Sequence, residues 1–128
     1  MGLYAISPTL RAMMSKEKSN GKVLQVNYGQ FDSEVLRSTV PVFVDFYADW
    51  CGPCQTIGPT LEALSEEYAD KVKFVKVNVD DNQEVAMKYE IMGIPTAMIF
   101  RNGTAKDTLV GAFPAATYRK TIERVLNA

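Results

Sequence analysis

Two cysteines separated by two residues are the side chains of this sequence best suited to chemistry. Cys51 and Cys54 are its only cysteines, and they stand in the run Trp50-Cys51-Gly52-Pro53-Cys54. Residues three apart on a helix have their β-carbons about 5 to 6 Å apart, which a small rotation closes to disulfide range. The spacing therefore predicts a pair that forms and opens a disulfide without refolding.

The position of the pair favours a reactive thiolate at Cys51. The pair follows the apolar run 40–47 and opens the stretch 51–69, whose apolar residues have helical spacing. The partial positive charge and unpaired N–H groups of a helix N-terminus lower the pKa of a thiol there. Gly52 lets another backbone come close, and Pro53 fits the first helical turn, where an N–H has no partner in any case.

The absence of histidine removes several alternative uses of these thiols. It excludes a Cys-His protease and a mixed Cys/His zinc site, and Gln55 stands where haem attachment needs histidine. Two cysteines are too few for a disulfide scaffold or an intramolecular four-thiolate metal site. Two structural cysteines buried in a helix remain an alternative, but the strand-to-helix setting favours redox chemistry. We expect no metal, and no cofactor beyond the Cys51–Cys54 disulfide.

Composition places the chain among globular proteins with a single domain. Of its 128 residues 47% are hydrophobic and 23% charged, and 14 Lys and Arg against 15 Asp and Glu leave a formal charge of −1. Because no broad cationic surface is expected, nucleic acid and anionic membranes are not predicted as partners. No apolar run approaches the roughly 18 residues of a membrane-spanning helix, so we expect a soluble protein.

The first 22 residues differ in charge from the rest of the chain. They carry four basic residues against one acidic residue, whereas residues 23–128 are net acidic. Pro8 and Thr9 interrupt the apolar start, which argues against a cleaved secretory leader. We interpret residues 1–22 as an extension that is flexible or forms a short helix, and residues 23–128 as the folded domain. The paired thiols fit a reducing cytoplasm.

The body of the chain alternates between strand-like and helix-like patterns, which predicts an α/β fold. The nearly continuous apolar run 40–47 has the composition of a strand covered on both faces, so it should be central. Asn102 and Gly103 form the strongest hairpin signal. Strands are expected at 23–27, 40–47, 72–79, 96–101 and 106–110, and helices at 30–37, 51–69, near 83–89 and from Pro114 onward.

Two charged residues stand alone within predicted strands. Asp45 lies in the run VFVDFY and Lys76 in the run FVKVNV. Burial among apolar side chains raises the pKa of a carboxyl group, which makes Asp45 a candidate proton acceptor near neutral pH. The alternatives are an Asp45 with its own hydrogen bonds at a strand end, and a solvated Lys76 on an edge strand.

Four short motifs give the sequence a family resemblance. The runs WCGPC, VDFYADW, GIPT and RNG are similar to those of the thioredoxin family, over about residues 23–128. The resemblance implies a mixed five-stranded sheet flanked by four helices, and a thiol-disulfide oxidoreductase that reduces disulfides in other proteins. It implies that Cys51 is the nucleophile and Cys54 the resolving cysteine. It also implies that Asp45 takes the proton of Cys54, through water, and that Lys76 lies near Asp45.

The resemblance further implies a docking surface for substrates beside the cysteines. The family carries a cis proline at the position of Pro95, packed against the active disulfide. A cis bond there turns the backbone of Ile94 outward, so that an extended substrate segment can pair with it as an added strand. The residues expected to contact substrate are Trp50, Gly52, Pro53, Gly93, Ile94, Pro95, Gly111 and Ala112; ordinary packing is the alternative for Trp50.

Three positions depart from the commonest pattern of the family. Gln55 stands where many members have lysine, Tyr47 stands where many have tryptophan, and Asp49 adds a negative charge beside the pair. We interpret Gln55 as a change in partner choice or association rate, and Tyr47 as a change in packing. We interpret Asp49 as a negative charge that slightly raises the pKa of the Cys51 thiol, against the effect of the helix N-terminus.

Three alternatives to a reductase remain open. A disulfide oxidase or isomerase is one, although Gly52-Pro53 resembles the reducing type. The second is a metal-bridged dimer, in which two chains bind zinc or an iron-sulfur cluster through their cysteine pairs. The third is an assembly subunit that docks partners without turnover. For a reductase, the resemblance implies a thioredoxin reductase, NADPH- or ferredoxin-linked, and disulfide-containing targets as partners. We expect the chain itself to be a monomer.

Overall fold

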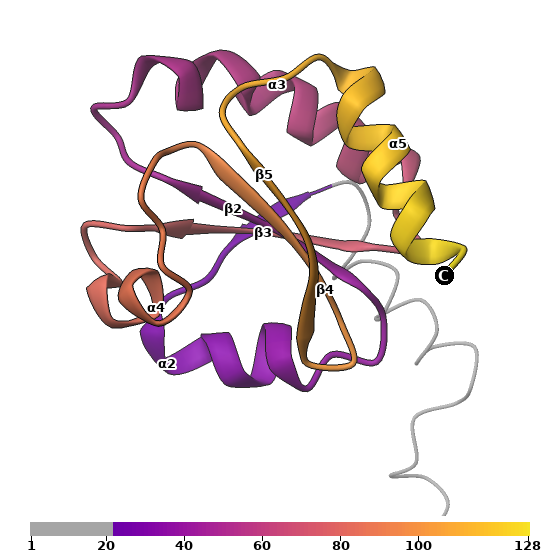
Figure 1. Ribbon diagram of the computed structural model, residues 1–128, viewed down its shortest axis with the longest axis horizontal. Helices are drawn as coiled ribbons and strands as arrows, with labels where there is room; N and C mark the ends of the chain where they lie inside the picture. Colours follow the sequence, from indigo (N-terminus) through magenta and orange to yellow (C-terminus); the bar gives the residue numbers. More distant parts are fainter. Residues whose placement is uncertain (1–21) are drawn as a thin grey trace, which may run out of the picture.

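The computed structural model describes residues 22–128 (Figure 1). The predicted extension at residues 1–22 therefore lies outside the described residues, apart from Lys22. In chain order the elements are β1 (Val23–Gln25), α2 (Tyr28–Phe31), a π-helical turn (Asp32–Leu36), β2 (Val42–Tyr47), α3 (Gly52–Glu67), β3 (Lys73–Asn78), α4 (Gln83–Lys88), β4 (Thr96–Arg101), β5 (Thr104–Val110) and α5 (Ala115–Leu126). None of these helices is long and apolar enough to cross a bilayer.

The five strands form one mixed sheet in the order β1-β3-β2-β4-β5. β3 pairs in parallel with β1 and with β2, whereas β4 pairs antiparallel with β2 and with β5. β2 is the central strand, as its apolar sequence predicted, and five of its six residues are buried. The mixed five-stranded sheet with its helices confirms the predicted fold class.

Helices cover both faces of the sheet (Figure 1). On one face α3 and α5 bury Leu61, Leu64 and Ile122 against Phe43 of β2. On the other, α2 with its π-helical turn and α4 pack on the opposite set of strand side chains, which includes Val44. Because side chains alternate along a strand, Asp45 points to the same face as Phe43, toward α3. The central strand thus places one carboxyl group beneath the helix that carries the cysteines.

Strand ends differ from the prediction at both edges of the sheet. β1 ends at Gln25 rather than residue 27, because the chain turns at Asn27 into α2. β5 begins at Thr104 rather than residue 106, directly after the predicted hairpin turn. Asn102 and Gly103 have φ angles of 54° and 78°, the left-handed backbone that a two-residue hairpin needs. Thr104 therefore pairs at once with the last residue of β4.

Candidate active site

The two cysteines lie where β2 has ended and α3 begins. They form a disulfide with a Cα–Cα distance of 5.3 Å. Cys51 is the N-cap of α3, with an extended backbone, and its Sγ accepts a hydrogen bond of 3.2 Å from the backbone N–H of Cys54. A free N–H group at a helix N-terminus stabilises negative charge on the atom it contacts. The fold therefore places the Cys51 sulfur where a thiolate is favoured.

Residues distant in the sequence surround the disulfide. Val79 and Ile94 pack against the buried cluster of Ala48 and the two cysteines. Cys51 Sγ lies 3.8 Å from the carbonyl oxygen of Ile94, and the bond from Ile94 to Pro95 is cis. These contacts bring the β3–α4 and α4–β4 connections to the redox pair.

The remaining predicted docking residues differ in their position relative to the cis proline. Gly111, with a φ angle of 110°, donates its N–H to the Pro95 carbonyl over 2.8 Å, which places it beside the cis proline. Gly93 directly precedes Ile94 and lies close to the side chain of Val110. Gly52, Pro53 and Ala112 are exposed.

The side chain of Trp50 lies on the surface of the molecule. It is 71% exposed, so the alternative of ordinary packing does not describe it. The indole N–H donates a hydrogen bond of 2.9 Å to Oδ2 of Asp80, in the connection between β3 and α4. This contact turns the indole toward an acidic loop, and sequence patterns gave no signal for it because the two residues are 30 positions apart.

Asp45 is buried beneath the cysteines. Its side chain is 7% exposed, and Oδ1 has no hydrogen-bond partner among the described residues. Burial raises the pKa of Asp45 to about 7, while the nearby charge of Lys76 acts in the opposite direction. Lys76 is its register partner on β3, an interior strand, so the alternative of an edge lysine is wrong.

A polar cavity of about 390 Å³ is lined by both Asp45 and Cys54. Its volume is ample for water, so a proton can pass between Cys54 and Asp45 without direct contact. Gly58 leaves room on the α3 side, since nothing lies within 4 Å of where its Cβ would stand. The lining residues are Gln25, Asp45, Tyr47, Asp49, Cys54, Gln55, Gly58, Lys76, Asn78 and Asp81.

Tyr47 belongs to this cavity, and its interpretation as a packing change is incomplete. Its hydroxyl accepts a hydrogen bond of 3.0 Å from Gln25 Nε2. Its ring lies under the ammonium group of Lys76, 5.4 Å from Nζ to the ring centroid. The signal for this role was the alternation of β2, which puts Tyr47 on the same face as Asp45.

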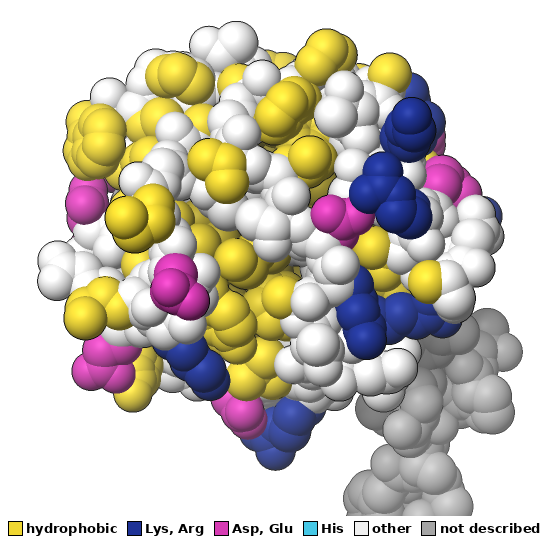
Figure 2. Space-filling view, viewed as in Figure 1, with side chains coloured by type: hydrophobic (Ala, Val, Ile, Leu, Met, Phe, Trp, Pro, Cys, Tyr) yellow, Lys and Arg dark blue, Asp and Glu magenta, His cyan; other side chains and the backbone are white. Residues whose placement is uncertain are grey.

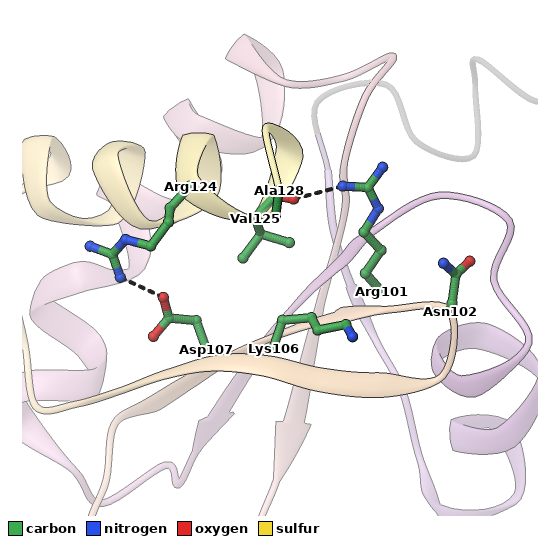
Figure 3. A pocket seen from close by; sticks show the side chains of 7 residues that line it. All are labelled: Arg101, Asn102, Lys106, Asp107, Arg124, Val125 and Ala128. Atoms are coloured by element: carbon green, nitrogen blue, oxygen red, sulfur yellow. Dashed lines mark hydrogen bonds and ion pairs between the residues drawn. The ribbon is translucent and has the colours of Figure 1, made fainter.

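A second cavity, of about 490 Å³, lies at the other end of the sheet, between the β4–β5 hairpin and the end of α5 (Figure 3). Arg101 donates from Nη1 to the carbonyl oxygens of Val125 and Leu126, which caps the last turn of α5. Arg124 forms an ion pair of 2.6 Å with Asp107. Both guanidinium groups therefore stabilise the packing of α5 against the hairpin. The candidate active site is the cavity beside the cysteines.

Comparison with known proteins agrees with this geometry. Residues 22–124 match the family model described as Thioredoxin. The chain is 44% identical over 105 residues to "Thioredoxin" of Porphyra purpurea, covering 82% of this chain and 98% of the relative. It is 49% identical over 96 residues to "Thioredoxin 1" of Synechococcus elongatus, covering 75% and 90%. It is 48% identical over 102 residues to "Thioredoxin M-type, chloroplastic" of Chlamydomonas reinhardtii, covering 80% and 73%.

A redox-active cysteine pair at the start of a helix, on a mixed sheet with a cis proline beside it, defines a class of thiol-disulfide oxidoreductases. The chain belongs to the thioredoxin family. It is a protein-disulfide reductase that uses the pair Cys51 and Cys54, and its partners are a reductase and disulfide-containing proteins. Disulfide oxidation and metal-bridged assembly are not favoured.

Proposed function

We propose that Cys51 is the nucleophile that attacks target disulfides. Its thiolate attacks one sulfur of the target disulfide, the target S–S bond breaks, and the other target sulfur leaves as a thiolate. A mixed disulfide between Cys51 and the target remains. The observation that carries this proposal is the hydrogen bond from the N–H of Cys54 to Cys51 Sγ at the start of α3, because it favours negative charge on that sulfur.

The second step completes the two-electron reduction of the target. Cys54, as a thiolate, attacks Cys51 Sγ, the mixed disulfide breaks, and the second target sulfur is released. Asp45 accepts the proton of Cys54 through water in the shared cavity, and that proton returns to a departing thiolate. The target gains two electrons, and the dithiol becomes the Cys51–Cys54 disulfide. Lys76, beside Asp45, carries a positive charge that lowers the pKa of the Asp45 carboxyl group.

Target segments dock on the surface formed by Trp50, Gly52, Pro53, Gly93, Ile94, Pro95, Gly111 and Ala112. The closeness of Ile94 to Cys51 Sγ supports this role, because a strand added along Ile94 brings a target sulfur to the nucleophile. No metal takes part, and the disulfide is the only redox cofactor.

The reduction potential of the Cys51/Cys54 couple tests the proposed direction of electron flow. Equilibration in defined thiol buffers, followed by alkylation and mass analysis, gives the ratio of dithiol to disulfide. We expect the value typical of thioredoxins, about −270 mV, which suits a general reductant. A value near about −120 mV marks a disulfide donor, and the absence of a two-electron transition leaves the metal-bridged or assembly alternative.

We also propose a cellular setting for this chemistry. A separate reductase, NADPH- or ferredoxin-linked, returns the disulfide to the dithiol, and the chain acts as a monomer in the cytoplasm. Two relatives are named chloroplastic M-type thioredoxins, so the chloroplast is the competing location. Reduction of the purified chain by each reductase class, and sedimentation at several concentrations, decide the reductase and the oligomeric state. Localisation of the tagged full chain decides the compartment.

A further inference from the structure

A groove lined by two methionines lies beside the redox pair. Met87 and Met92 have exposed fractions of 77% and 95%, the highest among the large apolar side chains in the described part of the chain. Both line a cavity of about 400 Å³ at the end of α4. We call this cavity the methionine groove; its lining residues are Val79, Gln83, Ala86, Met87, Glu90, Ile91 and Met92.

The backbone at the end of α4 forms the groove. α4 ends at Lys88, and Glu90 turns the chain with a φ angle of 53°. The N–H of Ile91 then donates to the carbonyl of Ala86 over 2.9 Å, which folds the following segment back along the helix. This return leaves Met92 on the surface, where its flexible side chain can adapt to different apolar groups.

The groove is continuous with the active site. Val79 lines the groove and also packs against the cluster that contains both cysteines. Met92 is two residues from Ile94, whose carbonyl lies 3.8 Å from Cys51 Sγ. An extended chain covers two residues in about 7 Å, so a target residue two or three positions from the attacked cysteine reaches the groove.

The charged residues around the groove and the active site are mostly acidic. Glu90 lines the groove, and Asp80 holds the indole of Trp50. Asp49 and Asp81 line the neighbouring cavity, where Lys76 is the one cationic lining residue described. On the face shown in Figure 2, most of the Lys and Arg side chains lie on the side of α5, and apolar side chains cover much of the α4 half. A cationic partner is therefore attracted to the redox end.

We propose that the methionine groove docks target polypeptides that carry a large apolar side chain two or three residues from the disulfide, flanked by Lys or Arg. This inference rests on the proposed function and adds a substrate class to it. A second copy of the chain is the less suited occupant, because a symmetric contact sets each patch against itself and brings the acidic residues together.

Synthetic disulfide peptides test the inference with the full chain. Four peptides share one disulfide and carry either Leu or Ser at the third position from it, combined with either Arg or Glu beside that residue. Stopped-flow fluorescence of Trp50 gives the second-order rate constant for the reduced protein with each peptide. The rate with hydroxyethyl disulfide, which has no side chains to dock, normalises each variant.

We expect the Leu/Arg peptide to react roughly tenfold faster than the Ser/Glu peptide. The double variant Met87→Gln, Met92→Gln loses the preference for Leu, and Glu90→Lys loses the preference for Arg and its dependence on ionic strength. Tyr28→Gln, which removes a 55% exposed aromatic ring at the start of α2, is the matched control and keeps both preferences.

Three results overturn the inference. Equal rates for all four peptides in the unaltered chain do so, as does a preference for Leu that survives in the methionine variant. A dimer that sedimentation detects, and that the methionine substitutions abolish, assigns the groove to a second copy instead. Failure to reduce hydroxyethyl disulfide as well as the peptides overturns the proposed function, and the inference falls with it.

Discussion

Asp45 and Lys76 are register partners on the neighbouring parallel strands β2 and β3, and both line one polar cavity beneath α3. The cavity also reaches Cys54, so an acid, a cation and a cysteine sulfur line one space. The acid is nevertheless buried enough for its pKa to rise to about 7 despite the nearby ammonium group. Desolvation therefore outweighs the attraction to Lys76, and the carboxyl group is set to exchange a proton near neutral pH.

The stability of the protein should fall as pH rises through the range in which Asp45 ionises. The pKa of Asp45 is about 7 in the folded chain and 3.8 when unperturbed, so the folded state holds the proton more tightly. Stability is therefore highest below about pH 4, declines between about pH 4 and pH 7, and is constant above that for this group. The difference corresponds to about 4 kcal/mol at most.

Urea unfolding of the chain and of the variant Asp45→Asn measures this effect. The variant cannot ionise, so its gain in unfolding free energy over the unaltered chain should grow from about pH 4 to about pH 8. Glu66→Gln, on the exposed surface of α3, is a suitable control. A gain that is the same at both pH values would show that Asp45 does not titrate in this range.

Replacing Asp45 should slow the second chemical step and spare the first. In Asp45→Asn, release of the target from the mixed disulfide should slow on the order of a hundredfold near neutral pH, because the proton acceptor for Cys54 is lost. Formation of the mixed disulfide at Cys51 should change little. Rapid mixing with a fluorescent disulfide substrate, followed by acid quenching, separates the two rates, and equal slowing of both would contradict the assignment.

Replacing Lys76 should shift the pH dependence of the same step. In Lys76→Met the positive charge that lowers the pKa of Asp45 is absent, so that pKa should rise further. The pH profile of target release should then move to higher pH, whereas Lys73→Met, on the same strand but paired with Glu34, should leave it in place. An unchanged profile in Lys76→Met would mean that the ammonium group acts elsewhere.

Removing the resolving thiol should trap target proteins. In Cys54→Ser the mixed disulfide at Cys51 has no neighbouring thiol to release it, so targets remain covalently attached. Mass analysis without reducing agent should identify Cys51 as the linked residue in stoichiometric adducts with a disulfide protein. The matched variant Cys51→Ser should trap far less, and comparable trapping by both variants would reverse the roles of the two thiols.

The Tyr118 hydroxyl should support the segment that carries Gly111. It donates to the Gly111 carbonyl and accepts from the Phe113 N–H, both over 3.3 Å. Tyr118→Phe should lower the free energy of unfolding by about 1 to 2 kcal/mol, because two backbone groups lose a partner. Tyr89→Phe is the control, since its ring packs against Phe31 and Phe100 and no hydrogen bond of its hydroxyl is described. Equal losses in the two variants would contradict this role.

Local patterns in the sequence determined the elements of this protein and its reactive pair. The spacing of Cys51 and Cys54, the apolar run of β2 and the turn at Asn102 and Gly103 each lie within a few residues, so their physical meaning needs no distant partner. The strand ends at Gln25 and Thr104 differed because hydrogen bonding to neighbouring strands and the geometry of turns set them.

Tertiary structure alone decided how the site is assembled. Ile94 reaches Cys51 across 43 positions, Asp80 reaches Trp50 across 30, and Tyr47 lies under Lys76 on another strand. The burial of an acid, the volume of a cavity and the exposure of a methionine depend on every element packed around them. Residue spacing within one segment contains none of that information, because the relevant distances run between segments that meet only when the sheet has formed.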